Sequence, residues 1–168
     1  ENGEVKSVKV DMGKAILNPA EIPVLLDGEN VVGREVIVGG NKHEITCVSM
    51  GNPHVVLFVD DDEKIPLEVI GPQIEKHSMF PDGVNVEFVS VISDNEIRMR
   101  VWERGSGVTM ACGTGACASV VAAVINGYCK MDTDVIVKAL GGDLTVRWCQ
   151  DNDVYLSGNA VKVFDGEI

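Results

Sequence analysis

The sequence predicts an α+β fold in which a mainly antiparallel β-sheet curls, like a barrel, around one central buried helix. Short segments of alternating apolar and polar residues recur along the chain, and Gly, Asn and Asp separate them, as is typical of strands joined by tight turns. One segment, residues 115–128, reads GACASVVAAVINGY and has no polar face. Because a helix that is apolar all round is buried, we expect this helix to lie inside the sheet.

The expected strands share a two-residue alternation and a short length. They are Val5–Met12, Lys42–Met50, His54–Asp60, Val84–Ile92, Asn95–Glu103, Asp134–Leu140, Asp143–Cys149, Val154–Ser157 and Ala160–Phe164. Residues 141–143 and 151–153 are typical of hairpin connections. A surface helix is expected over Pro66–His77, with Pro66 in the first turn, where proline is well tolerated.

The central helix is expected to run over about Gly113–Gly127. Its Ala, Cys, Ser and Gly residues are small, so the surrounding strands can approach its axis closely. Gly127 is suited to end the helix, because glycine readily adopts the left-handed conformation found after the last turn.

Composition narrows the class of protein. The 168 residues fit one domain of ordinary size. A net charge of −12 disfavours binding to nucleic acid or anionic membranes, and no apolar run approaches the roughly 20 residues of a membrane span. The five cysteines are odd in number and form no CxxC pair, so we expect neither disulfides nor a metal site, and a reducing cytoplasm is the simpler location.

The chemistry is concentrated in residues 103–116, which read ERGSGVTMACGTGA. Cys112 is expected at the N-terminus of the central helix, where unpaired N–H groups and the helix dipole should stabilise a thiolate and lower the pKa of Cys112 below about 8.5. The N–H groups of Gly113, Thr114 and Gly115 could hold a carboxylate. A base beside a bound carboxylate suits abstraction of an α-proton. The alternative is that Cys112 is a small core residue and the glycines only turn the chain.

Two further segments place polar residues at strand openings. MGNPH at residues 50–54 contains Asn52 and His54, and FPDGVNVEFV at residues 80–89 contains Asn85. Asn52 and His54 could bind a zwitterion, and His54 could transfer protons. Alternatively, residues 51–53 form only a turn, and the pair Glu103-Arg104 is only solvated.

These motifs together resemble the diaminopimelate epimerase family over nearly the whole chain. The ordered set is VKVDMG (8–13), MGNPH (50–54), FPDGVNVEFV (80–89), ERGSGVTMACGTGA (103–116) and GNAVKVFDGE (158–167). Proline racemases and phenazine-type isomerases share the family's fold, but MGNPH and the ERG block look like the epimerase.

The resemblance implies two similar domains, each a curled sheet around a helix with a cysteine at its N-terminus. One cysteine acts as thiolate base and the other as thiol acid on opposite faces of the α-carbon. The implied reaction interconverts LL- and meso-diaminopimelate for lysine and cell-wall synthesis, and it uses no pyridoxal phosphate, metal or other cofactor.

The resemblance also implies roles for individual residues. Cys112 corresponds to a catalytic cysteine, and Glu103 and His54 to residues that assist proton transfer. The residues that would hold the substrate are Asn52, Asn85, Arg104, Gly113 and Thr114.

The chain departs from the family pattern in one respect. The family's other cysteine lies in a Cys-Gly-Asn-Gly motif of the N-terminal domain, which does not occur here. Cys117 is no substitute, because five residues along a helix turn it roughly 140° away from Cys112. Residues 1–168 therefore look like a single C-terminal domain with half of an active site.

The partners expected are diaminopimelate, the missing N-terminal domain and, through the likeness of the two domains, a second copy in a homodimer. The isolated chain is expected to lack activity. Alternative readings are a carboxylate-binding or amino-acid-binding domain without catalysis, a relative of proline racemase or of the phenazine-type isomerases, and a domain without a ligand.

Overall fold

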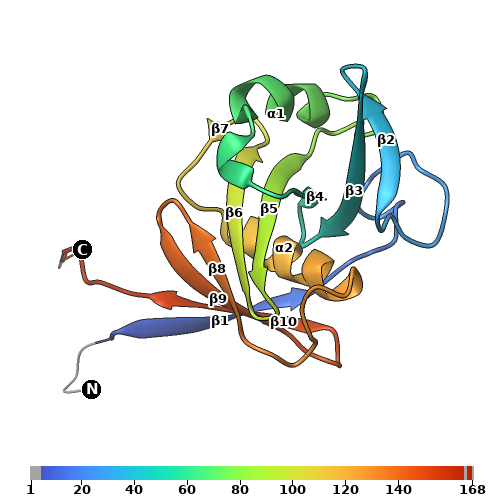
Figure 1. Ribbon diagram of the computed structural model, residues 1–168. Coiled ribbons are helices and arrows are strands. Elements are labelled where there is room, and N and C mark those ends of the chain that lie inside the picture. The colour runs from blue at the N-terminus through green and yellow to red at the C-terminus, as the bar shows by residue number, and fades with distance from the viewer. Residues whose placement is uncertain (1–4, 165, 168) are drawn as a thin grey trace.

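The computed structural model describes residues 5–164, 166 and 167. Within them, a ten-stranded sheet has the order β1-β10-β9-β8-β6-β5-β4-β3-β2, with β7 paired to β6 (Figure 1). The strands are β1 (Ser7–Lys14), β2 (Arg34–Val38), β3 (Asn41–Ser49), β4 (Pro53–Phe58), β5 (Asn85–Ser93), β6 (Glu96–Glu103), β7 (Gly107–Val108), β8 (Val135–Ala139), β9 (Gly142–Trp148) and β10 (Asp153–Asn159).

The sheet is mainly antiparallel, as predicted, with two parallel pairs. β4 pairs parallel with β5, and β6 pairs parallel with β8. Parallel neighbours need a crossover connection, and these two crossovers contain the helices α1 (Leu67–Glu75) and α2 (Gly113–Ile125). A short 3₁₀ turn, Asp62–Lys64, precedes α1. The α+β class and the large sheet are thus confirmed.

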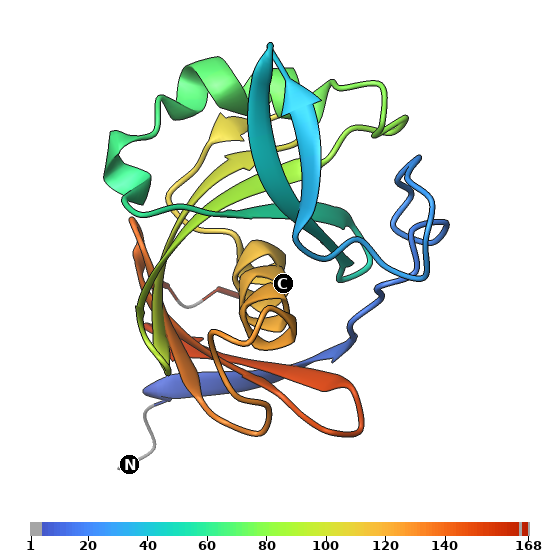
Figure 2. The same ribbon diagram turned by 45° about the vertical axis from the view of Figure 1, so that its right-hand side comes forward.

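The barrel-like part of the prediction is not confirmed, because the sheet is open. Its end strands are β1 and β2, which are not neighbours in the strand order. Beyond β1, an antiparallel bridge joins Ile16 to Ser49 at the end of β3. The sheet therefore wraps around α2 without a continuous ladder between its two ends (Figure 2).

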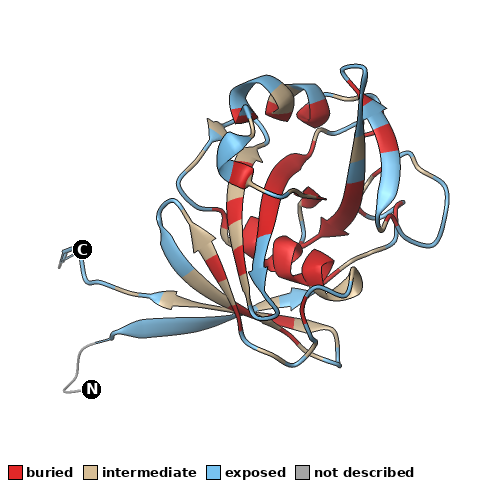
Figure 3. Ribbon diagram, viewed as in Figure 1, coloured by how far each residue is buried: buried red, intermediate tan, exposed pale blue. Residues whose placement is uncertain are grey.

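Helix α2 lies in the concave face of the sheet and contacts strands from β3 to β10 (Figure 2). Its residues from Gly115 to Ala123 are all buried, as the apolar sequence predicts (Figure 3). The helix ends at Ile125, and Gly127 follows with a φ of +81°. Glycine tolerates this left-handed conformation, so Gly127 does end the helix, two residues beyond its last helical residue.

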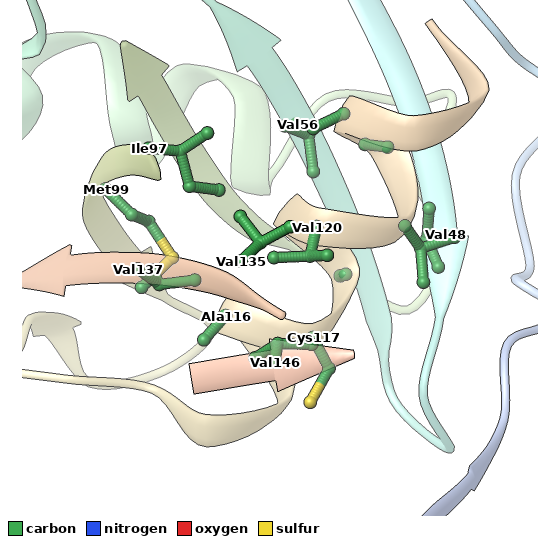
Figure 4. Packing of buried hydrophobic residues seen from close by; sticks show 14 of the residues in the cluster. Val48, Val56, Ile97, Met99, Ala116, Cys117, Val120, Val135, Val137 and Val146 are labelled. Atoms are coloured by element: carbon green, nitrogen blue, oxygen red, sulfur yellow. The ribbon is translucent and has the colours of Figure 1, made fainter. Parts of the chain in front are cut away.

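Two hydrophobic clusters stabilise the molecule. The first surrounds α2, where Val120 and Cys117 pack among Val48, Val137 and Val146 of the surrounding strands (Figure 4). The second lies beneath α1 and β2 and is centred on large buried side chains such as those of Phe88, Ile74 and Leu57.

Helix α1 forms on the surface, as predicted, although Pro66 is its N-cap and not a first-turn residue. Its buried face is held against β6, because Gly71 lies directly over Trp102. A Cβ atom at Gly71 would stand 2.6 Å from Cγ of Trp102.

The strand predictions differ from the structure in three places, the shortest being β7, a two-residue strand that was not predicted. Residues 160–164 form no strand. The β1–β10 ladder ends at the pair Ser7–Asn159, and beyond it Ala160 donates a hydrogen bond to the carbonyl of Lys6. The alternation of apolar residues in 160–164 is therefore not sufficient to form a strand. Conversely, β2 was not predicted. It pairs with β3 through a turn at Gly39-Gly40, both with positive φ, which suits a two-residue hairpin.

Neither helix of the described residues has the length and apolarity that crossing a bilayer requires.

Candidate active site

Cys112 is the N-cap of α2, which places it where the sequence predicted. Its backbone is extended, with φ −132° and ψ 112°, and the glycines that follow allow the chain to turn directly into the helix. The N–H group of Gly115 donates to Cys112 Sγ at 3.3 Å, and the Thr114 hydroxyl lies 3.5 Å from the same sulfur. The sulfur thus lies at the positive end of the buried helix.

The structure corrects the expected pKa of Cys112. Only 7% of the residue is exposed, and burial raises the pKa of its thiol above the ordinary value. The hydrogen bonds from Thr114 and Gly115 lower this pKa, whereas the negative charges of Glu87 and Glu103 raise it. Desolvation of the thiolate outweighs the two hydrogen bonds, which a sequence argument from the helix terminus alone did not include.

The expected carboxylate cradle also needs one correction. The N–H group of Gly115 is directed at Cys112 Sγ and is therefore not free for a ligand. Gly113 and Thr114, the first two residues of α2, are partly exposed. N–H groups in the first turn of a helix have no partner within the helix, so these two positions are the ones suited to a carboxylate.

A chain of polar contacts leads from Cys112 into the core. Asn52 Nδ2 donates to Thr114 Oγ1 at 3.2 Å, and Asn52 Oδ1 lies 3.1 Å from His54 Nε2. His54 Nδ1 in turn lies 2.7 Å from Glu87 Oε1. The chain joins the first turn of α2 to the turn before β4, to β4 itself and to β5.

Glu87 was not identified from the sequence as a site residue. Its side chain is wholly buried, and its Oε2 atom has no hydrogen-bond partner. Burial raises the pKa of Glu87, while His54 lowers it and Glu103 raises it. A signal did exist in the sequence, because Glu87 is the one charged residue in the run VNVEFV, and such a run reads as a buried strand.

A second group of predicted residues lies at the same end of the sheet. Asn85 pairs with His54 across the parallel strands β4 and β5. Its side-chain amide donates to the carbonyl of Pro53 and accepts from the N–H group of Arg104, each at 2.9 Å. Asn85 therefore holds the loop after β6 beside the turn before β4.

Arg104 and Glu103 are less enclosed than Asn85. The guanidinium of Arg104, an exposed residue, donates to the carbonyl of Asp82 at 3.0 Å. Glu103 Oε1 accepts a 2.5 Å hydrogen bond from the hydroxyl of Thr109. All eight residues expected at the site thus lie around the N-terminus of α2 and the ends of β3 to β6, although only four belong to the hydrogen-bonded chain.

Among the described residues, no group of three or more His, Cys, Asp and Glu side chains is placed to hold a metal ion. The five cysteines are free thiols.

Solved structures share this fold. A hydroxyproline epimerase from Agrobacterium vitis superposes with a TM-score of 0.63 at 15% identity, over 95% of this chain and 51% of that one. A probable proline racemase from Agrobacterium radiobacter gives 0.62 at 13% identity, over 98% and 56%. At these identities the likeness concerns the fold alone, which is the fold of these epimerase and racemase structures.

Sequence comparison identifies the family. Residues 46–163 match the diaminopimelate epimerase family. The diaminopimelate epimerase of Geobacillus thermodenitrificans is 52% identical over 99% of this chain, and that of Desulfitobacterium hafniense is 55% identical over 97%. The chain belongs to the diaminopimelate epimerase family, which confirms the resemblance seen in the motifs. It spans 58% and 57% of the lengths of these two relatives.

Proposed function

We propose that this chain provides one half of the active site of a diaminopimelate epimerase, and that Cys112 exchanges a proton with the α-carbon of the substrate. The observation that carries the proposal is the position of Cys112 as N-cap of a buried helix, where the N–H group of Gly115 donates to its sulfur and the Thr114 hydroxyl lies within hydrogen-bond distance of it. A thiolate at this position takes the α-proton from one face, and the thiol returns one to the same face.

Substrate binding would use the first turn of α2. The N–H groups of Gly113 and Thr114 would bind the carboxylate beside the reacting carbon, because the helix terminus attracts anions. This interaction also favours proton removal, since the negative charge that develops next to the carboxylate meets fixed donors. Asn52, Asn85 and Arg104 would hold the distal amino-acid group, and Glu103 and His54 would assist proton transfer.

Inversion needs a second acid or base on the opposite face of the α-carbon. We infer that this group comes from the part of the relatives that the chain does not span. The complete enzyme would then interconvert LL- and meso-diaminopimelate without pyridoxal phosphate or a metal, in a reducing compartment such as the cytoplasm, which suits five free thiols.

The test compares this chain alone with the same chain joined to the N-terminal part of the Desulfitobacterium relative. Deuterium incorporation at the α-carbon and optical inversion are measured with diaminopimelate in deuterium oxide. We expect inversion only in the joined protein, and loss of inversion with Cys112→Ala. The matched control is Cys117→Ala, which removes a buried thiol from the same helix and should retain turnover. Inversion by the joined Cys112→Ala protein would refute the proposal.

The raised pKa of Cys112 favours one alternative, a domain that binds a carboxylate without catalysis. A joined protein that binds diaminopimelate in calorimetry, but exchanges no deuterium, would support that alternative. Sedimentation of the chain alone tests whether two copies associate, because a homodimer could bring two Cys112 side chains to one cleft.

A further inference from the structure

Glu87, the buried partner of His54, has no role in the proposed function. Both side chains are 0% exposed, and they are joined by a 2.7 Å contact between Nδ1 and Oε1. The pair does not reach the first turn of α2 directly. It reaches Cys112 only through Asn52 and Thr114.

Burial restricts the protons that this pair can hold. An ionised glutamate beside a neutral histidine would leave a net negative charge without water around it, which is strongly unfavourable. The pair is therefore expected to keep one more proton. Either the carboxylate accepts from a doubly protonated ring, or a carboxylic acid donates to Nδ1. In both arrangements His54 carries a proton on Nε2.

That proton fixes the direction of the remaining contacts. His54 Nε2 donates to Asn52 Oδ1 at 3.1 Å, so the Asn52 amide nitrogen faces Thr114 Oγ1 at 3.2 Å. Because the Thr114 oxygen then accepts a hydrogen bond, its hydroxyl proton is free to point at Cys112 Sγ, 3.5 Å away. Without a proton on Nε2 the amide would turn over, and Thr114 would donate to Asn52 instead.

We propose that Glu87 is a positioning residue for Cys112: it holds the proton on His54 Nε2, and the chain through Asn52 directs the Thr114 hydroxyl at the sulfur. Hydrogen bonds to a charged acceptor are the strong ones, so this arrangement favours the thiolate that proton abstraction requires. The inference deepens the proposed function and rests on its assignment of Cys112. The raised pKa of Glu87, caused by burial, agrees with retention of the proton.

Gly115 permits this arrangement. A Cβ atom there would stand 2.8 Å from Glu87 Oε1 and 3.2 Å from Cys112 Sγ. The Glu87 carboxyl group therefore packs against the helix backbone in the space that a side chain at position 115 would occupy.

Other charged groups near Cys112 must be considered in a test based on pH. Glu103 on β6 and Glu87 on β5 both raise the pKa of Cys112, and the charge of Cys112 in turn raises the pKa of Cys117 on α2. His54 on β4 is paired with Glu87. Removing the Glu87 charge directly would lower the pKa of Cys112, whereas loss of the directed chain would raise it. The sign of the change thus separates the two roles.

The first experiment follows alkylation of each thiol by iodoacetamide against pH, resolved by peptide mass spectrometry, in this chain without substrate. In Glu87→Gln, the neutral amide can accept from Nδ1 or donate to it, so nothing fixes the proton on Nε2. We expect Cys112 to react about three- to tenfold more slowly near neutral pH, with its midpoint displaced upward by up to about one pKa unit. An unchanged or faster reaction would overturn the proposal.

Two controls accompany this variant. Glu75→Gln changes another buried glutamate, one that accepts hydrogen bonds from Trp102 and Gly105, and should leave the Cys112 profile unchanged. In a Thr114→Val background, Glu87→Gln should have no further effect, because the last contact of the chain is already absent. If Glu87→Gln slowed the alkylation of Cys112 as much in that background as in the unaltered protein, the proposed hydrogen-bonded chain would be contradicted.

The second measurement does not depend on a variant that folds. In the unaltered chain, ¹⁵N NMR of the imidazoles should show His54 Nε2 protonated throughout the pH range in which Cys112 titrates. An unprotonated Nε2 would overturn the proposal. Neither measurement uses diaminopimelate. An inactive joined enzyme would defeat the proposed function alone, and an active one whose Cys112 ignores Glu87→Gln would defeat this inference alone.

Discussion

At the first turn of α2, Gly115 lies between the sulfur of Cys112 and the buried carboxyl group of Glu87. Gly115 donates to Cys112 Sγ and lies against Glu87. The glycine spacing around Cys112 is visible in the sequence, which explains why the cap position was predicted correctly. Glu87 was missed because its importance comes from its burial and from pairing between distant segments, neither of which the local motif contains.

Replacing Gly115 should therefore destabilise the protein more than replacing Gly113, which lies in the same turn of the helix. In Gly115→Ala the new methyl group would overlap Glu87 Oε1, which is held by His54, so we expect a loss of about 1–3 kcal/mol in the free energy of unfolding. Urea denaturation measures this loss. In the matched variant Gly113→Ala, the methyl group meets only the flexible end of Leu156, at 3.2 Å. Equal losses in both variants would contradict the argument.

The burial of the five cysteines determines the order in which we expect them to be alkylated. Cys149 is partly exposed, whereas Cys47, Cys112, Cys117 and Cys129 are buried. The low pKa expected from the sequence would make Cys112 the first thiol to be alkylated, but its burial and its raised pKa remove that advantage. We now expect Cys149 to be alkylated first and Cys112 second, because the N–H group of Gly115 donates to the Cys112 sulfur and Cys112 is the N-cap of α2, next to two partly exposed residues. Mass spectrometry of partially alkylated protein gives the order, and earlier reaction of Cys117 would contradict it.

At the scale of elements, helix α2 and most strands follow from periodicity, while the exceptions depend on tertiary pairing. Residues 115–128 have no polar face, which indicates a buried helix. Residues 160–164 alternate as a strand does, but within the part of the chain that the structure describes they pair with no strand, and Val161 and Val163 are 84% and 89% exposed. The strand β2 was overlooked because it contains only three consecutive apolar residues, which follow the charged pair Arg34 and Glu35.

The burial of α2 also predicts how stability depends on pH. Burial raises the pKa of Cys117 from 9.0 to about 12. Between these two values the folded state retains a proton that the unfolded chain loses. The contribution of Cys117 to the free energy of unfolding is therefore fully present below about pH 9 and is lost as the pH rises toward 12. The full difference is on the order of 4 kcal/mol at about 1.36 kcal/mol per pKa unit.

Chemical denaturation between about pH 8 and 11 tests this linkage. Cys117→Ala should lose less stability over that range than the unaltered chain, although it begins from a lower value because of the cavity. Ser119→Ala, which changes a buried residue of the same helix without an ionisable group, should keep the original slope. A Cys117→Ala slope equal to the original would show that this thiol does not titrate with unfolding.

For the whole molecule, the α+β class was predictable because it depends on counting local elements. The openness of the sheet was not, because closure depends on whether β1 and β2 meet, and this is decided by the path of residues 15–33 between them. The site shares this limit. Cys112 and Thr114 are neighbours in sequence, but Asn52, His54 and Glu87 join them only once the strands have paired.

The β1–β10 ladder extends away from the rest of the molecule (Figure 1), and apolar side chains on β1 and after β10 are exposed. Val8 and Val10 on β1 are 45% and 44% exposed, and Val161, Val163 and Phe164 beyond β10 are 81–89% exposed. Exposed apolar groups favour association, whereas the net charge of −12 opposes it. Charge repulsion is screened by salt, and the Debye length falls from about 10 Å at 0.1 M to about 3 Å at 1 M.

Self-association should therefore increase with salt. We expect sedimentation velocity to show a larger dimer fraction at high ionic strength than at low ionic strength, at one protein concentration. Phe164→Ser should reduce that fraction, because it removes the largest of these exposed apolar groups. Leu25→Ser, at a residue that is 67% exposed in the segment before β2, should have little effect. A chain that stays monomeric at every salt concentration would show that these side chains do not overcome the entropy of association.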